Sequence, residues 1–323
     1  MARVLTGIQP SGTLHIGNYF GAMKPMIDFM NQTEDEVFVM VADYHALTSL
    51  HDAQALRENV KNVILDWLAV GLDPEKVTFY VQSDIPEVQE LTWLLHTVCP
   101  MGLLQRATSY RDKVENGVDA SSALFTYPVL QAADILMVGA EIVPVGKDQK
   151  QHIEIARDIA QKFNNTYGEL FVLPEDQISD HVAVVPGVDG RKMSKSYNNT
   201  IPLFAEESVI RKKIMSIETD SKEVADKKDP ESCNVFALYK LMATQEEQNA
   251  LAQKYKTGGM GYGDAKKVLF EKIKETFSTM WEKRKTLEED KGLIEKVRVM
   301  GEEKVKRVAR KFVEKARRKT GIR

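Results

Sequence analysis

The sequence predicts an α/β protein: a doubly wound parallel sheet of the Rossmann type, followed by a C-terminal α-helical domain. The first 190 residues alternate short apolar runs with amphipathic stretches. Apolar strands that alternate with helices are typical of parallel sheets buried on both faces. After a turn-rich break at residues 186–190, the pattern is helical to the end, with no convincing strand.

The elements follow from the periodicity of the apolar residues. Strands are predicted at residues 4–7, 36–42, 77–81 and 141–145. Helices are predicted at residues 16–30, 53–70 and 149–163. We expect residues 1–188 to form the sheet domain, residues 189–200 a loop and hinge, and residues 201–323 a helical domain.

Composition limits the class of protein. The chain has 323 residues, 43% hydrophobic and 28% charged, as in ordinary globular proteins. Its two cysteines, Cys99 and Cys233, are too few for a disulfide framework or a four-cysteine metal site. No signal-peptide core and no apolar run of about 18 residues is present. We therefore expect a cytoplasmic protein with no membrane partner.

Charge is unevenly distributed along the chain. The net charge of −3 argues against a generic polyanion-binding protein, and we expect no DNA partner. Residues 296–323, however, contain 12 Lys and Arg against 3 Glu, a local net charge of +9. This segment is either a surface that faces phosphates or a solvated terminal helix whose charges keep it soluble.

The turn after the first predicted strand has the features of a phosphate site. Doubly wound sheets bind nucleotides at such turns, although the spacing here is neither a dinucleotide fingerprint nor a Walker A loop. Glycines allow close approach of the backbone to phosphate, and a helix start favours anions. His15 and Asn18 lie one turn apart and provide two nitrogen donors. The alternative is that Gly12 is only a turn and His15 only a helix cap.

A second candidate follows the turn-rich break. Residues 191–196 contain Lys192 and Lys195, three positions apart and flanked by serines. In an exposed, mobile loop, two lysines suit a clamp on a triphosphate or on departing pyrophosphate. Alone, this run would be an ordinary charged loop.

Together, the two motifs resemble the HIGH and KMSKS motifs of class I aminoacyl-tRNA synthetases. Residues 7–22 are similar to the opening of tryptophanyl-tRNA synthetases of the bacterial type, and the blocks at 42–48, 126–134 and 143–152 agree. The resemblance implies ATP-dependent activation of L-tryptophan to tryptophanyl-adenylate and pyrophosphate, followed by transfer to tRNA(Trp). It also implies a homodimer, a KMSKS loop at 189–200 and an anticodon-binding helical domain.

The resemblance further implies roles for individual residues. His15, Asn18, Lys192 and Lys195 would be catalytic, with Asn18 in place of the second histidine of the strict motif. Mg²⁺ would be carried by the ATP, and no metal site on the protein is expected. The implied ATP-binding residues are Gln9, Pro10, Ser11, Gly12, His15, Gly17, Asn18, Val143, Gly146, Asp148, Lys192, Met193, Ser194, Lys195 and Ser196.

For the amino acid, Asp134 is expected to accept the indole N–H, since an ionised acceptor makes a charge-assisted bond. Tyr127 and Gln149 would hold the α-amino group, and His45 would position the carboxylate or phosphates. Phenylalanine should be excluded by roughly 10⁴-fold. The implied amino-acid-binding residues are Gly7, His45, Tyr127, Gln131, Asp134, Val143, Val145 and Gln149.

Other interpretations remain at this stage. Asp134 also suits the cap of a helix starting near residue 135, and Tyr127 a core aromatic. Gln131 stands where many tryptophanyl enzymes carry methionine, and its pattern with Tyr127 and Asp134 also resembles tyrosyl-tRNA synthetases. A catalytically silent paralogue that binds RNA and a small-molecule adenylyltransferase are further candidates.

Some tryptophanyl relatives carry an iron–sulfur cluster in the helical domain. Here Cys233 is the only cysteine at a corresponding position, since Tyr255, Tyr262 and Ala265 occupy the others. We predict no cluster.

Overall fold

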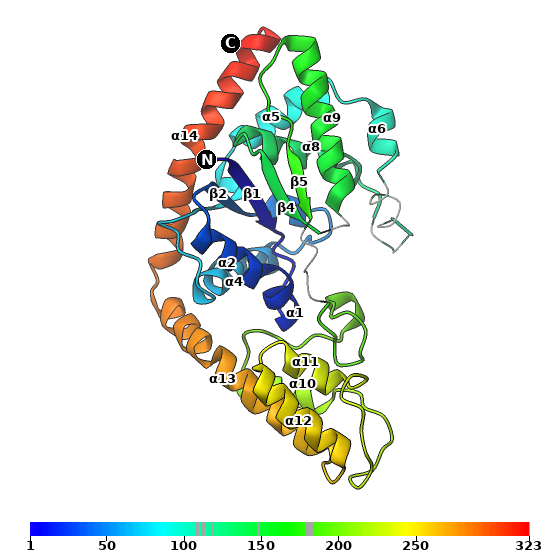
Figure 1. Ribbon diagram of the computed structural model, residues 1–323. Coiled ribbons are helices and arrows are strands. Elements are labelled where there is room, and N and C mark those ends of the chain that lie inside the picture. Colours follow the sequence, from blue (N-terminus) through cyan, green and yellow to red (C-terminus); the bar gives the residue numbers. More distant parts are fainter. Residues whose placement is uncertain are drawn as a thin grey trace.

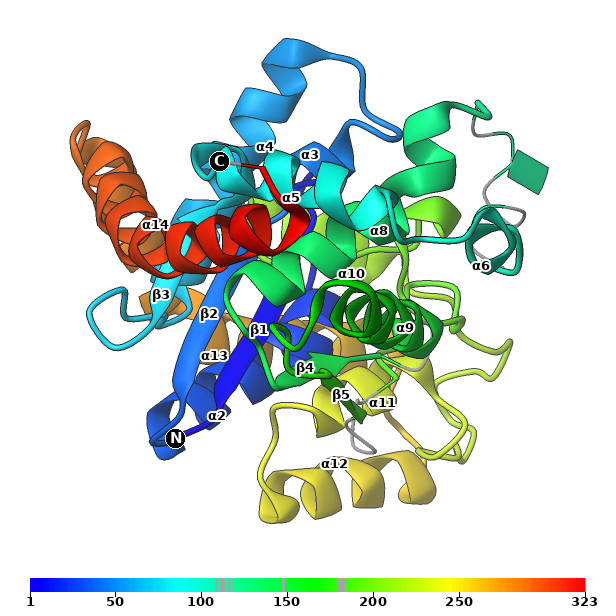
Figure 2. The ribbon, with the colours of Figure 1, turned by 90° about the horizontal axis from the view of Figure 1, so that it is seen from above.

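The sheet organises the N-terminal part of the molecule. The computed structural model describes residues 1–107, 110, 114, 115, 117, 119–146, 149–178 and 184–322. Its five strands are β1 (Arg3–Ile8), β2 (Glu36–Val41), β3 (Thr78–Val81), β4 (Ile142–Val145) and β5 (Glu175–Ile178). All neighbours pair in parallel in the order β3-β2-β1-β4-β5, which Figure 2 shows from left to right. This confirms the predicted fold class.

Alternating side chains of the strands pack against helices on both faces. Val4, Val37 and Val39 belong to one buried cluster, with residues of α4 (Ala53–Ala69). Their neighbours Leu5 and Phe38 belong to another, with residues of three further helices. These three are α5 (Glu87–His96), α8 (Ser122–Met137) and α9 (Lys150–Tyr167). Such two-sided burial explains why β2 and β3 are almost entirely apolar.

The predicted helix at residues 16–30 is present, but it is not regular. It consists of α1 (Ile16–Asn18), a π-helical turn η1 (Tyr19–Met23) and α2 (Lys24–Gln32). Among the described residues, the sheet domain also has the short helices α3 (Asp43–Ala46), η2 (Gln82–Asp84) and α6 (Met101–Gln105). A further short turn, η4 (Lys195–Tyr197), lies in the loop at residues 189–198, which contains Lys192 and Lys195 and is called the lysine loop below.

The helical part begins after this loop and is joined to the sheet domain by a long helix. It comprises α10 (Glu207–Met215), α11 (Asn234–Lys240), α12 (Gln245–Thr257) and α13 (Tyr262–Glu289). Near the C-terminal end of α13, Arg284 Nε donates to Asp66 Oδ1 of α4 at 2.7 Å, and both side chains are largely buried. This ion pair connects α13 to the sheet domain.

The last helix, α14 (Leu293–Thr320), lies along the sheet domain rather than among the other C-terminal helices (Figure 1). It packs against the edge strand β3 and against α5. Arg298 pairs with Asp84, and Arg310 with Glu87. Covering an edge strand removes a surface that would otherwise pair with other chains. None of the described helices is both long and apolar enough to cross a membrane.

Gly301 permits this close packing. A Cβ at this position would lie 1.9 Å from the carbonyl oxygen of Phe79 in β3. We predict that Gly301→Ala lowers the free energy of unfolding by about 3 kcal/mol or more, since α14 must move away from the strand. Gly263→Ala is the matched control, because no atom lies within 4 Å of the added Cβ. Urea denaturation measures both, and equal stability of the two variants would contradict the packing argument.

Candidate functional site

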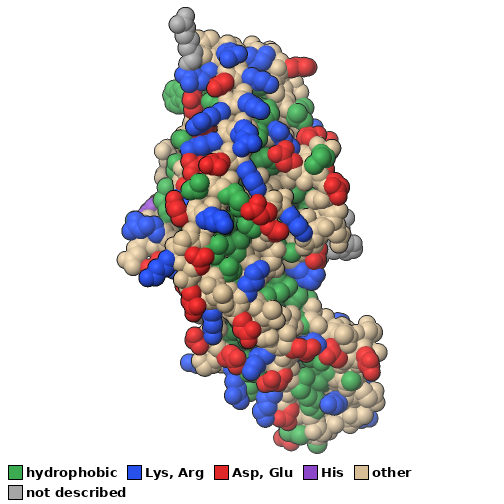
Figure 3. All heavy atoms as spheres, turned by 90° about the vertical axis from the view of Figure 1, so that its left-hand side faces the viewer, with side chains coloured by type: hydrophobic (Ala, Val, Ile, Leu, Met, Phe, Trp, Pro, Cys, Tyr) green, Lys and Arg blue, Asp and Glu red, His purple; other side chains and the backbone are tan. Residues whose placement is uncertain are grey.

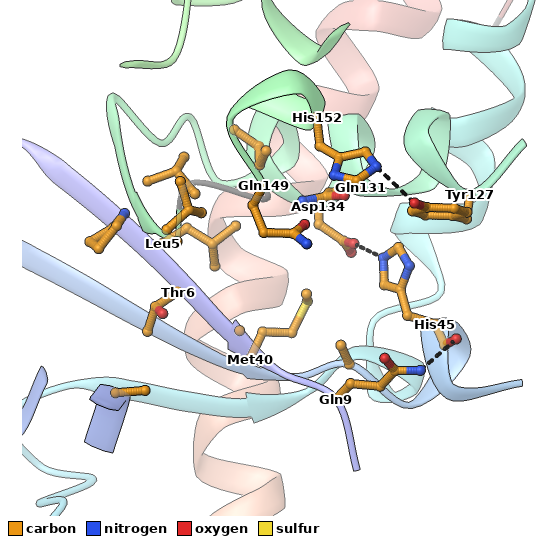
Figure 4. Close-up of a pocket in the computed structure, with 18 of the residues that line it drawn as sticks. Leu5, Thr6, Gln9, Met40, His45, Tyr127, Gln131, Asp134, Gln149 and His152 are labelled. Carbon is orange, nitrogen blue, oxygen red and sulfur yellow. Dashed lines mark hydrogen bonds and ion pairs between the residues drawn. The ribbon is translucent and has the colours of Figure 1, made fainter. Parts of the chain in front are cut away.

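A cavity of about 650 Å³ opens at the carboxyl ends of β1 and β4. In the strand order β3-β2-β1-β4-β5, the chain crosses from β1 to one side first and to the other side later. The carboxyl ends of β1 and β4 therefore diverge into opposite crossovers, which leaves a crevice between them. Residues of β1, α8, β4 and the start of α9 line this crevice (Figure 4).

The residues predicted to bind the amino acid are together in this cavity. Its lining also includes three residues predicted for ATP: Gln9, Val143 and Gly146. Asp148 lies outside the described residues. The predicted amino-acid-binding residues in the lining are Gly7, His45, Tyr127, Gln131, Asp134, Val143, Val145 and Gln149.

Asp134 is the buried polar group of the cavity. It lies in the last turn of α8, so it does not cap a helix start. The carboxylate is only 1% exposed, and His45 Nε2 lies 2.9 Å from Oδ2. Gln82 Nε2 donates to both carboxylate oxygens at 2.9 Å. Burial raises the pKa of Asp134 above its ordinary value, while the hydrogen bonds from His45 and Gln82 act in the opposite direction.

Tyr127 and His152 form the polar side of the cavity next to Asp134 (Figure 4). The Tyr127 hydroxyl lies 2.7 Å from His152 Nε2. The Tyr127 ring also meets the His45 ring edge-on, with ring centres 6.1 Å apart. Tyr127 is therefore a wall of the cavity rather than part of the apolar core.

His15 is both a helix cap and an oriented donor. The ring Nδ1 of His15 accepts the Asn18 backbone N–H at 3.3 Å, and the backbone N–H of His15 donates to Asn18 Oδ1 at 3.0 Å. Burial and, to a lesser extent, the charge of Lys195 lower the pKa of His15 to about 4. The imidazole is therefore neutral near pH 7, and with Nδ1 accepting, its proton is on Nε2. The two interpretations of His15 in the sequence are thus compatible.

The lysine loop lies against this first turn, although about 180 residues separate them. Ile16 N–H donates to Ile201 O, and Leu203 N–H donates to Leu14 O, both at 3.0 Å. These two bonds join the segment before α1 to the segment after the loop.

Side chains complete the contact between the turn and the loop. Gly17 N–H donates to the sulfur of Met193 at 3.3 Å, and Lys195 Nζ donates to Ser11 O at 3.3 Å. Gly12 has φ of +108°, which suits a glycine. Desolvation lowers the pKa of Lys195. Lys192 remains exposed at the edge of the loop. The turn and the loop therefore form one continuous nitrogen-rich surface.

Besides His152, the sequence did not identify Gln82 and Asn199 as residues of this region. Gln82 begins the short helix after β3 and holds Asp134 in position. A polar residue directly after an apolar strand was the available signal, because strand ends surround the sites of such sheets. The other is Asn199, buried beside the lysine loop, and no local pattern distinguishes it from a loop asparagine.

The described residues contain no group of three or more His, Cys, Asp or Glu that could hold a metal ion. Cys233 is buried, and its sulfur lies 3.5 Å from the Tyr255 hydroxyl. The absence of an iron–sulfur cluster stays a prediction.

Comparison with known proteins gives consistent matches. The family model for class I tRNA synthetases (W and Y) matches residues 1–278. The tryptophan–tRNA ligase of Rhodopirellula baltica is 51% identical over 321 residues, covering 99% of this chain and all of that protein.

Solved structures agree with this match. Tryptophanyl-tRNA synthetase from Campylobacter jejuni, complexed with ADP and tryptophan, is 48% identical with a TM-score of 0.96, over 99% of this chain and all of that one. The Mycoplasma pneumoniae enzyme is 30% identical with a TM-score of 0.80, over 100% of this chain and 98% of that one.

The support of Asp134 by Gln82 leads to a pH-dependent prediction. Gln82 is fully buried, and its Oε1 also accepts the Tyr44 N–H. Gln82→Leu removes a donor from Asp134, which keeps its bond to His45, and an acceptor from the Tyr44 N–H, which keeps its bond to Asp43. The change should cost about 2 kcal/mol near pH 7. Loss of the Gln82 Nε2 donor raises the already elevated pKa of Asp134 further. The cost should therefore be smaller at low pH, where protonation of Asp134 removes the charge that Gln82 supports, and grow as pH rises through the folded-state pKa.

Urea denaturation of Gln82→Leu between pH 4 and pH 8 tests this. Gln54→Leu, on the exposed face of α4, is the control and should behave like the unmodified chain. A cost that does not change with pH would contradict the proposed support of an ionisable Asp134.

Proposed function

The chain belongs to the class I tRNA synthetases for tryptophan and tyrosine, and we propose that it is a tryptophan–tRNA ligase. It activates L-tryptophan with ATP to tryptophanyl-adenylate and pyrophosphate, then transfers the tryptophan to tRNA(Trp). Two supports are the full-length similarity to tryptophan–tRNA ligases and the Campylobacter jejuni structure, which holds ADP and tryptophan. Aminoacylation serves translation, and we propose that it occurs in the cytoplasm.

The single observation that carries the amino-acid assignment is Asp134. Its carboxylate is buried at a cavity whose lining also includes the apolar residues Leu5, Met40 and Val143. Gln82 and His45 fix its orientation without filling the cavity. A fixed carboxylate in a dry cavity favours a ligand that brings one N–H on a flat apolar body, as indole does. Phenylalanine would leave Asp134 without this donor, which explains discrimination without editing.

The other amino-acid contacts extend from Asp134 toward the cavity mouth. Tyr127 and Gln149 hold the α-amino group, and His45 helps to position the carboxylate. Gln131 completes the wall on α8, and the backbone around Gly7 borders the reacting carboxylate. These roles are supported by the presence of all these residues in one lining.

For ATP, the oriented nitrogen donors carry the chemistry. His15 presents its Nε2–H, and Asn18 keeps its amide NH₂ group available because its Oδ1 is used in the cap. Lys192 and Lys195 stabilise the negative charge that develops on the departing pyrophosphate. A contact that strengthens in the transition state raises the rate rather than substrate affinity. Gln9, Val143 and Gly146 border the adenosine.

Mg²⁺ suits this site only as a companion of the nucleotide. The phosphate-facing groups are N–H donors and ammonium groups, whereas Mg²⁺ prefers oxygen ligands. The described residues near the lysine loop offer no carboxylate cluster for it. When bound, the ion would neutralise phosphate oxygens, and the residues of this chain would orient the same phosphates from the other side.

The tRNA partner is supported by the exposed side of α14. Some of its basic residues form ion pairs with the sheet domain, as Arg298 and Arg310 do. Others, including Lys311 and Lys315, are exposed and have no ion pair within the described residues. With Arg3 they line a small hollow of about 220 Å³. Figure 3 shows Lys and Arg side chains gathered on the upper part of the face that it draws. We propose that this face contacts tRNA phosphates, while the helical domain binds the anticodon.

The proposed homodimer has a candidate surface on the sheet domain. Trp93 of α5 is 69% exposed, and Met101 at the start of α6 is 60% exposed. Large apolar side chains of this kind are commonly buried between subunits. Sedimentation equilibrium distinguishes a dimer from a monomer, and Trp93→Asp should shift the balance toward the monomer.

ATP–pyrophosphate exchange with tryptophan and tyrosine offered separately tests the proposed function. Tryptophan should support exchange and tyrosine should not, because the cavity presents Asp134 to an indole N–H. Lys195→Ala controls for contaminating enzyme and should lose most of the exchange. Exchange with tyrosine alone would show a tyrosyl enzyme, and exchange with neither would favour the silent RNA-binding paralogue.

The tRNA contact is tested by salt dependence. Lys311→Gln/Lys315→Gln should weaken tRNA binding and reduce the slope of log K against log[salt] by about 1.5, since each phosphate contact contributes about 0.7–0.9. Exchange with tryptophan should be unchanged. Lys76→Gln/Lys162→Gln, on exposed positions elsewhere, is the matched control. An equal slope in both double variants would refute the proposed contact.

A further inference from the structure

Asn199 is a buried amide directly after the lysine loop, and all its side-chain contacts are to that loop. The residue is 1% exposed. Its Oδ1 accepts the Ser194 N–H at 2.8 Å, and its Nδ2 donates to Asp189 Oδ1 at 2.7 Å. The same Nδ2 donates to Lys192 O at 3.2 Å. One amide thus forms hydrogen bonds to three residues of the loop, Asp189, Lys192 and Ser194.

The backbone around Asn199 leaves no freedom for this amide. A Cβ on Gly187 would lie 2.3 Å from both Cγ and Nδ2 of Asn199. The Asn199 carbonyl accepts the Val188 N–H at 2.9 Å. Asp189, in turn, accepts from the backbone and the guanidinium of Arg191. The amide therefore sits in a slot formed by the loop's own entry segment.

Only an amide satisfies this slot. It requires one acceptor for the Ser194 N–H and two donors for Asp189 and the Lys192 carbonyl. A carboxylate would face two acceptors, and an apolar side chain would remove one partner from each of the three groups. Asn199 therefore serves the conformation of the loop rather than the packing of the core.

The contacts lead from Asn199 to the loop's lysines. Ser194, held by Asn199, caps the short turn η4 by accepting the Ser196 N–H. η4 begins with Lys195, whose ammonium donates to Ser11 O in the turn after β1. The Lys192 carbonyl is fixed by the same amide.

We propose that Asn199 is a positioning residue for the adenylation step, which presents Lys192 and Lys195 to the ATP phosphates through its amide. The proposal rests on the proposed function, because the lysines act only where a pyrophosphate leaves. Loss of the amide would leave tryptophan binding intact, since the cavity around Asp134 is formed by other elements.

The kinetic test compares Asn199→Ala with the unmodified chain in ATP–pyrophosphate exchange. The variant should lower kcat about 10- to 100-fold, as expected when catalytic groups are displaced by roughly 1 Å. The Kd for tryptophan should change less than about twofold. Asn198→Gly, at the neighbouring position, is the matched control. Asn198 has φ of +51°, which glycine adopts readily, so this variant should retain its exchange rate.

A double-mutant cycle with Lys195→Ala separates positioning from general damage. If Asn199 acts partly through Lys195, Asn199→Ala should cost clearly less in the Lys195→Ala background than alone. Gly187→Ala is a second route to the same change, because its Cβ displaces the amide while Asn199 remains. It should reproduce the loss of kcat, with the Kd for tryptophan unchanged.

Amide hydrogen exchange provides a readout independent of activity. The Ser194 N–H, protected by Asn199 in the unmodified chain, should exchange faster in both variants, while the strand amides stay protected. Additive effects with Lys195→Ala, parallel loss of tryptophan affinity, or an unchanged Ser194 amide would overturn the proposal. No exchange by the unmodified chain would instead overturn the proposed function itself.

Discussion

The active region depends on a short piece of antiparallel backbone pairing between Leu14–Ile16 and Ile201–Leu203. The two hydrogen bonds cross from the sheet domain to the chain that leaves the lysine loop. His15 and Lys195 are about 180 residues apart in sequence, and without these bonds they would lie on separate surfaces. With them, a rigid donor at a strand end and a charged loop share one anion site, which one domain alone could not form.

The same pairing explains the state of His15. The paired backbone segments help to exclude water from the His15 ring, which disfavours the charged imidazolium. The nearby ammonium of Lys195 repels that charge as well, so the neutral form is favoured. A neutral imidazole with Nδ1 in the helix cap is a directed donor rather than a diffuse charge. Asp134 shows the opposite solution: its burial is offset by fixed donors from Gln82 and His45. Each buried group is thus prepared before a ligand arrives.

Much of this was predictable where the signal is local. The strands around Leu5, Phe38 and Phe79 are apolar because both faces are covered, and glycines and lysines at fixed spacing mark the two motifs. The edge strand β5, Glu-Asp-Gln-Ile, lacks an apolar run and was not predicted. Gln82 acts on Asp134, which is distant in sequence, and the contacts of Asn199 exist only once the loop is folded. The docking of α14 depends on the close contact between Gly301 and Phe79. These are tertiary properties that no local pattern contains.

We infer that the turn after β1 and the lysine loop form one site. An NMR titration of the His15 ring, in the unmodified chain and in Lys195→Met, tests it most directly. We expect a pKa of about 4 for His15 in the unmodified chain. In Lys195→Met the pKa should be higher, yet still below 6.5, because burial of the ring persists while the neighbouring charge is removed. A His15 that titrates near 6.5, or one that does not respond to the loss of Lys195, would contradict it.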